Sequence, residues 1–246
     1  MKIVVLTNGS KHGLEIIRDL KKEKINIQSI FLEKKILRQK ELNLLKSKIG
    51  KFTSLIPFKN SLYSIYRKLK YNDNSAKTFK GYSKNIYEVP SLTGKICEEI
   101  LSKIKPDIIV LGGSRILKEN IINIPKIGTL NAHPGILPYY RGLDVIKWAL
   151  YNNDKIGVTI HYVDSKIDSG PICLQEELNI KKGSSIHSIK DEAIKVSGRL
   201  MSKVVSEIIN SGKIRTFPNE LDKGTYYKTM NKEINEKLIK KLSQSE

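Results

Sequence analysis

The sequence of 246 residues has few of the features that mark a secreted or membrane protein. Its only two cysteines, Cys97 and Cys173, lie far apart, with no histidine or second cysteine at metal-ligand spacing. We therefore expect no disulfide framework and no metal. No apolar run approaches the roughly 20 residues that span a bilayer. Because Met1–Leu6 also shows no signal-peptide pattern, we expect a cytoplasmic protein without membrane contact.

Basic residues, by contrast, are abundant. There are 44 Lys and Arg residues against 25 Asp and Glu, which gives a formal net charge of +19. A charge of this size attracts phosphates and nucleic acid. Lysine dominates and is spread through the expected helices, which favours a solvated basic surface over a nucleic-acid groove. The 39% hydrophobic and 28% charged residues are typical of a globular protein.

Short apolar runs alternate with segments of helical spacing along most of the chain. This alternation predicts an α/β fold with a doubly wound, mostly parallel Rossmann-like sheet. Strands are expected at 2–7, 25–32, 107–111, 129–131, 157–163 and 172–180. Helices are expected after the loop Asn8-Gly-Ser10, at 93–105, and at 184–211 with Ser184 as N-cap. The segment 132–142 is expected to be an ordered loop.

The expected domain organisation is a catalytic domain, 1–212, followed by a short C-terminal extension, 213–246. A helical insertion is expected within the catalytic domain at about 33–87, where two amphipathic patterns occur. Lysine, arginine and tyrosine are interleaved there, a mixture that single-strand binders use for stacking. Packed tyrosines beside a solvated lysine face explain the pattern as well, and we favour that interpretation.

Three side chains with catalytic potential occur near expected strand ends. Asn131 and His133 lie two residues apart, so they project to the same side if strand geometry continues. Asp168 lies in a later loop that closes with Gly-Pro. Acyl transfer to an amine needs an oxyanion donor, a proton acceptor and a group that orients the acceptor. The three residues suit those roles, although each also occurs as an ordinary turn former or structural residue.

Several ordered motifs resemble one known family. The segment 130–142, Leu-Asn-Ala-His-Pro-Gly-Ile-Leu-Pro-Tyr-Tyr-Arg-Gly, is similar to the signature of the folate-dependent formyltransferases. The similarity continues at 111–117, 157–163 and 166–172, and it covers roughly 106–178. This family includes glycinamide ribonucleotide transformylase, methionyl-tRNA formyltransferase and the sugar N-formyltransferases.

The resemblance implies that 10-formyltetrahydrofolate is the formyl donor and that no metal takes part. It implies that Asn131 stabilises the oxyanion, that His133 stabilises it and takes part in proton transfer, and that Asp168 orients His133 or handles protons through water. The donor's pterin is expected between 115–117 and 164–168. The expected donor-binding residues are Ser114, Arg115, Ile116, Leu117, Val163, Asp164 and Ile167.

The acceptor is less well defined by the sequence. The segments 140–148 and 224–228 look like those of sugar N-formyltransferases, so we expect an amine on a nucleotide-linked sugar. Glycinamide ribonucleotide and methionyl-tRNA stay as alternatives, although 213–246 is short for the C-terminal barrel of the tRNA enzymes. A noncatalytic nucleic-acid-binding protein is a third alternative. The expected acceptor-binding residues are Asn8, Gly9, Ser10, Tyr140 and Arg141.

The other histidines receive separate interpretations. His161 alternates within a strand and is expected to be structural or to support the site from behind. His12 lies in the first loop, where a helix start favours anions, but the loop departs from the glycine pattern of the ribonucleotide enzyme. His187 is expected to be exposed near a helix start. Whether two subunits form a homodimer is left open by the sequence.

Overall fold

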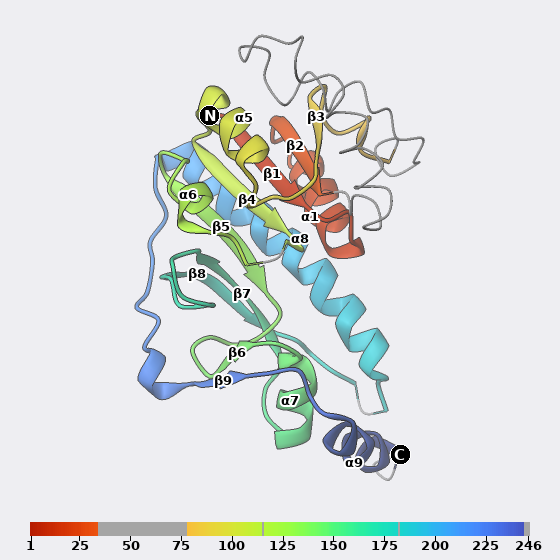
Figure 1. Cartoon of the computed structure of the whole chain (residues 1–246). Coiled ribbons are helices and arrows are strands. Elements are labelled where there is room, and N and C mark those ends of the chain that lie inside the picture. Colours follow the sequence, from red (N-terminus) through yellow and green to blue (C-terminus); the bar gives the residue numbers. More distant parts are fainter. Residues whose placement is uncertain (34–77, 115, 182, 244–246) are drawn as a thin grey trace, which may run out of the picture.

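A computed structural model describes residues 1–33, 78–114, 116–181 and 183–243. They form a seven-stranded sheet in the order β3-β2-β1-β4-β5-β7-β8, with helices on both faces (Figure 1). This arrangement confirms the predicted Rossmann-like class. The strands are β1 (Ile3–Thr7), β2 (Ile27–Glu33), β3 (Ile86–Val89), β4 (Ile108–Gly112), β5 (Gly128–His133), β7 (Gly157–Tyr162) and β8 (Ile172–Glu177).

The first five strands in the sheet order are parallel, and β7 and β8 continue the sheet in antiparallel pairings. All residues of β1 and β4 are buried. This explains why these strands read as continuous apolar runs, since a parallel sheet is covered on both faces.

Two helical layers cover the sheet. Helices α1 (Lys11–Lys22) and α8 (Ile186–Ser211) pack on one face, and α5 (Lys95–Ile104) and α6 (Glu119–Ile122) pack on the other. Alternate residues of β1 contribute to each layer, because successive side chains of a strand point to opposite faces. Within the described part of the chain, no helix is long and apolar enough to cross a membrane.

The segment expected to be a C-terminal extension packs onto the rest of the described chain. Strand β9 (Thr225–Tyr227) pairs in parallel with β6 (Tyr140–Gly142), after the short 3-10 helix η1 (Leu221–Lys223). Helix α9 (Lys232–Ser243) lies against α7 (Val145–Asn152), as Figure 1 shows. The ring of Tyr227 stacks between Tyr140 and Trp148, at centroid distances of 5.2 and 5.1 Å. The extension is therefore part of the packed structure.

Some expected boundaries differ from the structure. Most of the expected insertion, 33–87, lies outside the described residues and stays a prediction, and edge strand β3, Ile86–Val89, was not predicted. Strand β5 continues through His133, and β6 follows within the segment expected to be a loop. The N-cap of α8 is Ser185, not Ser184, because Ser185 Oγ accepts a hydrogen bond from the Ser188 amide.

Candidate active site

The candidate catalytic residues meet at the carboxyl ends of β4 and β5. Strand β5 lies between β4 and β7 in the sheet. Asn131 on β5 is in register with Leu111 of β4 on one side and with His161 of β7 on the other. His133 is the last residue of β5 and follows Asn131 by two positions. Open α/β sheets bind ligands at this edge.

His133 is buried, with acceptor atoms facing both ring nitrogens. Nε2 lies 2.8 Å from the carbonyl oxygen of Tyr140, and Nδ1 lies 3.4 Å from Asp168 Oδ2. Because a carbonyl can only accept, Nε2 carries the proton in this arrangement. Nδ1 is consequently the position at which the ring can gain a proton, beside a carboxylate that would stabilise it.

Asp168 is held in place by segments on two sides. Its backbone is left-handed, with φ of +49°, and its Oδ2 accepts a hydrogen bond of 2.9 Å from the Gly142 amide. From the C-terminal extension, Asn219 Nδ2 donates to the carbonyl oxygens of Asp168 and Gly170, at 3.0 and 3.1 Å. The carboxylate is thereby aimed at the histidines by contacts far apart in sequence.

His161 also belongs to the site. Its ring is buried, with Nδ1 2.8 Å from the Tyr162 carbonyl oxygen and Nε2 3.2 Å from Asn131 Nδ2. Burial, reinforced by the neighbouring His133, lowers the pKa of His161 to about 4. The sequence left His161 as either structural or supporting the site from behind, because nothing local reveals that β7 pairs in register with β5.

A cavity of about 220 Å³ opens over these residues. Asn131, His133, His161 and Asp168 line it on one side. The expected donor-binding residues Ser114, Ile116, Leu117, Val163, Asp164 and Ile167 also line it, together with Leu143 and Tyr226, which were not predicted. Arg115 lies outside the described residues. The structure thus brings the two segments expected to hold a pterin to one cavity, beside the three candidate catalytic residues.

Comparison with known proteins shows the family. The family model described as formyl transferase matches residues 1–205. The chain belongs to the formyl transferase family. The resemblance carried by the motifs at 111–117, 130–142 and 157–172 is therefore confirmed at the level of the family.

The curated relatives include two methionyl-tRNA formyltransferases. Those of Kosmotoga olearia and a Sulfurihydrogenibium species are 34% and 37% identical to this chain over 137 and 136 residues. The matches cover 55% and 54% of this chain but 44% and 43% of the relatives. The chain therefore spans less than half the length of these curated relatives.

Solved structures share the fold at lower identity. A 4-N formyltransferase from Francisella tularensis has a TM-score of 0.62 at 19% identity, covering 92% of this chain and 76% of that one. Phosphoribosylglycinamide formyltransferase from Bacillus halodurans has a TM-score of 0.62 at 18% identity, covering 87% and 97%. A formyltransferase from Anoxybacillus kamchatkensis, solved with UDP-4,6-dideoxy-4-formamido-L-AltNAc and tetrahydrofolate, has a TM-score of 0.54 at 20% identity, covering 95% and 88%.

The expected acceptor residues of the first loop do not line the cavity at Asn131. Asn8 Oδ1 accepts from the Ser10 amide, and Ser10 Oγ accepts from the Gly13 amide as the N-cap of α1. Gly9 adopts the left-handed conformation that turns the loop, with φ of +78°. Beside them, burial lowers the pKa of His12 to about 4. Acceptor binding by this loop stays a prediction.

Acceptor binding by Tyr140 stays a prediction, although its side chain has partners within the fold. Its ring is buried against Tyr227, its hydroxyl donates to Asp154 and accepts from Asn152, and burial raises its pKa to about 12. These contacts assign the Tyr140 side chain to packing, while its carbonyl oxygen contacts His133.

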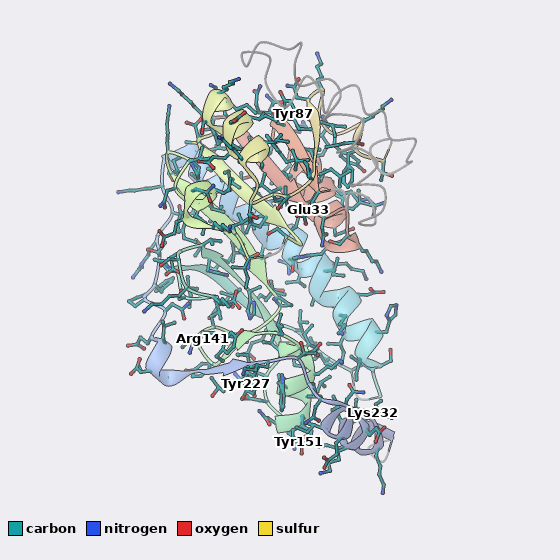
Figure 2. The ribbon with its side chains drawn as sticks, viewed as in Figure 1. Glu33, Tyr87, Arg141, Tyr151, Tyr227 and Lys232 are labelled. Atoms are coloured by element: carbon teal, nitrogen blue, oxygen red, sulfur yellow. The ribbon has the colours of Figure 1, made fainter. Side chains whose placement is uncertain are left out.

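Arg141, the next residue along β6, precedes the cavity-lining Gly142 but does not itself line the cavity. It lies near Tyr227, where β6 and β9 pair (Figure 2), and Nη2 donates to the Leu221 carbonyl oxygen at 3.3 Å. Within the ranges that the structure describes, its Nε is buried without a hydrogen-bond partner.

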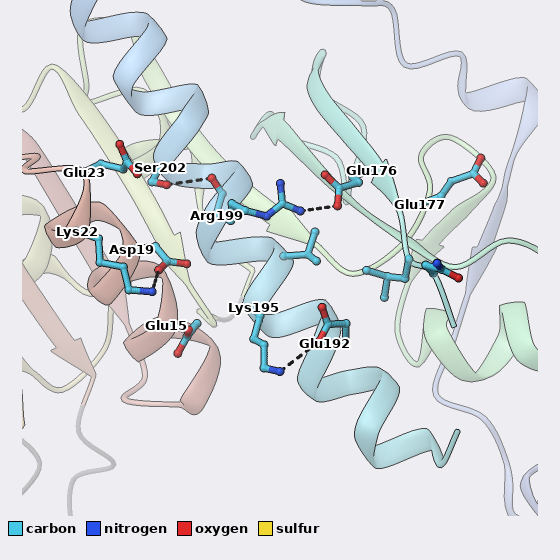
Figure 3. A pocket seen from close by; sticks show the side chains of 13 residues that line it. Glu15, Asp19, Lys22, Glu23, Glu176, Glu177, Glu192, Lys195, Arg199 and Ser202 are labelled. Carbon is cyan, nitrogen blue, oxygen red and sulfur yellow. Dashed lines mark hydrogen bonds and ion pairs between the residues drawn. The ribbon is translucent and has the colours of Figure 1, made fainter. Parts of the chain in front are cut away.

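A larger hollow, of about 540 Å³, lies between α1, α8 and the end of β8 (Figure 3). Six carboxylates line it, but five of them form ion pairs: Glu15 with Arg18, Asp19 with Lys22, Glu176 with Arg199, Glu177 with Lys155 and Glu192 with Lys195. None of the candidate catalytic residues lines it. We therefore place the active site in the smaller cavity at Asn131.

Proposed function

We propose that this chain transfers a formyl group from 10-formyltetrahydrofolate to a primary amine carried by an amino-sugar nucleotide, in the cytoplasm. The observation that carries the proposal is the single cavity at which Asn131, His133 and Asp168 meet the segments 114–117 and 163–168. Membership of the formyl transferase family supports the group transferred. No metal enters the proposal.

The proposed reaction begins when the amine nitrogen attacks the formyl carbon. A new carbon–nitrogen bond forms, and negative charge develops on the formyl oxygen, where an N–H of Asn131 would donate. The amine's proton passes to Nδ1 of His133, directly or through water, and Asp168 stabilises the charged ring. Cleavage of the donor's carbon–nitrogen bond, with return of a proton to the donor nitrogen, completes the transfer.

The cavity wall fits a flat, largely apolar ring with polar edges. Ile116 is 71% exposed and lies on the cavity together with Leu117 and Val163, so these side chains offer apolar contact to a pterin. Backbone groups of Ser114, Ile116 and Leu117 and of 163–168 can supply hydrogen-bonding partners around the apolar surface. The solved relative from Anoxybacillus kamchatkensis contains tetrahydrofolate, which supports a folate donor.

Replacing Ile116 by aspartate is expected to weaken binding of a folate analogue by about tenfold, because a charge would replace apolar surface facing the ring. Ile239→Asp is the matched control, since Ile239 on α9 is also exposed, at 53%, and lies outside the cavity. Titration calorimetry measures both affinities. Equal affinity in the two variants contradicts a pterin site at Ile116.

Two features beside the cavity support a nucleotide-linked acceptor. Arg141 offers a buried Nε without a partner in the described structure, and guanidinium groups bind phosphates through several donors. Tyr226 on β9 is 44% exposed and lines the cavity, so its ring can stack on a sugar or base. The Anoxybacillus kamchatkensis structure contains a UDP-linked formamido sugar.

Replacing Arg141 by methionine is expected to raise KM for a nucleotide-linked amine by about tenfold to a hundredfold, with a smaller change in kcat, because a charge-assisted hydrogen bond is lost. Arg18→Met is the control, since Arg18 lies on α1 and pairs with Glu15. Steady-state kinetics measures both variants, and melting curves check that β6 and β9 stay paired. An unchanged KM in folded Arg141→Met removes Arg141 from the acceptor site.

The curated relatives favour a second candidate, because those named above are methionyl-tRNA formyltransferases. The deciding experiment incubates the protein and 10-formyltetrahydrofolate with amino-sugar nucleotides, glycinamide ribonucleotide or methionyl-tRNA, and detects formylated product by mass. We expect turnover of an amino-sugar nucleotide. If only methionyl-tRNA or only the ribonucleotide is formylated, the proposed amino-sugar nucleotide acceptor is wrong. If the protein binds nucleic acid in a salt-dependent manner and formylates no acceptor, the proposed enzymatic activity is wrong.

A further inference from the structure

We propose that His161 is a positioning residue for Asn131: its ring accepts a hydrogen bond from the Asn131 amide and so turns the second N–H of that amide toward the cavity. The catalytic part of this inference rests on the proposed function. The arrangement of the two side chains does not, because it follows from distances within the sheet.

The protonation of His161 follows from its partners. Nδ1 lies 2.8 Å from the Tyr162 carbonyl oxygen, which can only accept, so Nδ1 carries the proton. The ring is buried, and burial disfavours a second proton, which keeps the pKa of His161 far below the ordinary value. Nε2 therefore presents a lone pair toward Asn131 Nδ2, at 3.2 Å.

The charged groups near Nε2 act in opposite directions, and burial decides in favour of the neutral ring. The carboxylates of Asp168 and Asp164 raise the pKa of His161, but Asp168 Oδ1 lies 3.8 Å from Nε2, which is too long for a good hydrogen bond, and the carboxylate has the Gly142 amide as a closer partner. The ring of His133 stands edge-on to His161 at a centroid distance of 6.4 Å, and its proximity lowers the pKa of His161. The amide of Asn131 is thus the partner that suits an unprotonated Nε2.

An asparagine needs such a partner if it is to stabilise an oxyanion. Its amide can turn over, exchanging an N–H donor for a carbonyl oxygen of nearly the same shape. An oxygen aimed at the developing oxyanion would repel it. The register of β5 with β7 fixes Asn131 and His161 opposite each other. Since the lone pair on His161 Nε2 can accept a hydrogen bond only from the NH₂ group of Asn131, the amide is held with its NH₂ group toward His161 before substrate binds.

The first test reads the tautomer without any turnover. The chain has four histidines, so ¹⁵N-labelled imidazoles give a resolvable long-range ¹H–¹⁵N spectrum, and His161→Gln identifies the signals of His161. We expect a protonated Nδ1 and an unprotonated Nε2 at neutral pH. A neutral ring protonated at Nε2, or a doubly protonated ring, overturns the proposal whether or not the protein formylates any acceptor.

The second test uses formylation of whichever acceptor the panel identifies. His161→Leu is expected to lower kcat by about tenfold to a hundredfold with little change in KM, whereas His161→Gln, whose amide oxygen can accept from Asn131, should lose no more than about threefold. The exposed His187, changed to leucine, is the control. Melting curves and folate-analogue affinity verify the fold of each variant.

A double-mutant cycle separates positioning from a general structural role. If His161 acts through Asn131, adding His161→Leu to Asn131→Ala costs less than about threefold beyond Asn131→Ala alone. Multiplicative losses, or an equal loss in His161→Gln and His161→Leu, overturn the proposal. The two experiments can also give different answers. If NMR finds the Nδ1-protonated tautomer of His161 but no acceptor is formylated, the proposed function is wrong, whereas the proposed hydrogen bond between His161 and Asn131 is still supported.

Discussion

Replacing His133 by asparagine, or Asp168 by alanine, is expected to lower the turnover of formyl transfer by about two to four powers of ten. Both residues are proposed to act on charge and protons that develop as the amine attacks. The folate donor is expected to be held mainly by backbone and apolar contacts around Ile116 and Val163. Its affinity should therefore change much less than kcat, because the lost interactions belong to the transition state.

Steady-state formylation and folate-analogue titration measure the two effects separately for each variant. His187→Asn is the control for His133→Asn, because the His187 side chain is 86% exposed on α8. Melting curves verify that the variants fold, since His133 is buried. Near-normal turnover in a folded His133→Asn protein contradicts the proposed mechanism.

Replacing Gly224 by alanine is expected to destabilise the protein by about 1 to 3 kcal/mol and to lower turnover by about tenfold or more. A Cβ at Gly224 would overlap the carbonyl oxygen of Pro138, a backbone atom that cannot move aside without displacing β6. Because Thr225 donates to the Tyr139 carbonyl next to this contact, β9 would lose its pairing, and Tyr226 would leave the cavity wall.

Gly81→Ala is the matched control, since a Cβ at Gly81 would meet no atom within 4 Å. Chemical denaturation measures the loss of stability, and steady-state kinetics at a temperature where both variants are folded measures turnover. If Gly224→Ala matches Gly81→Ala in both measurements, the contact between β9 and β6 contributes neither to folding nor to the site.

The sheet was predictable because its strands carry strong local signals. Strands β1 and β4 are buried on both faces, so each reads as an unbroken apolar run, and the helices between them show their period in the sequence. Strand β3 was not predicted, because it is an edge strand of four residues, mostly half-buried. Such a short strand depends on pairing with β2, which local sequence does not show.

Asn131 and His133 could be predicted as neighbours from the sequence, because they lie two residues apart on one strand and so project to the same side. The sequence left His161 as either structural or supporting the site, and Tyr226 was not identified as a site residue, because each reaches the cavity only through pairing: β7 with β5, and β9 with β6. Tyr140 shows the opposite case. Its place in a family-like motif suggested ligand binding, yet its hydroxyl is occupied by Asp154 and Asn152.

The clamp of Asn219 on the loop at Asp168 has a consequence for a protein that is still being synthesised. The ribosome releases Asn131, His133 and Asp168 before Asn219, so a nascent chain that has emerged only to Ser211 carries these residues without the contacts that hold the Asp168 backbone. Domains fold largely from the N-terminus during synthesis. The sheet can therefore form first, and under the proposed function we expect the growing chain to transfer formyl groups slowly until the segment that carries Asn219 docks.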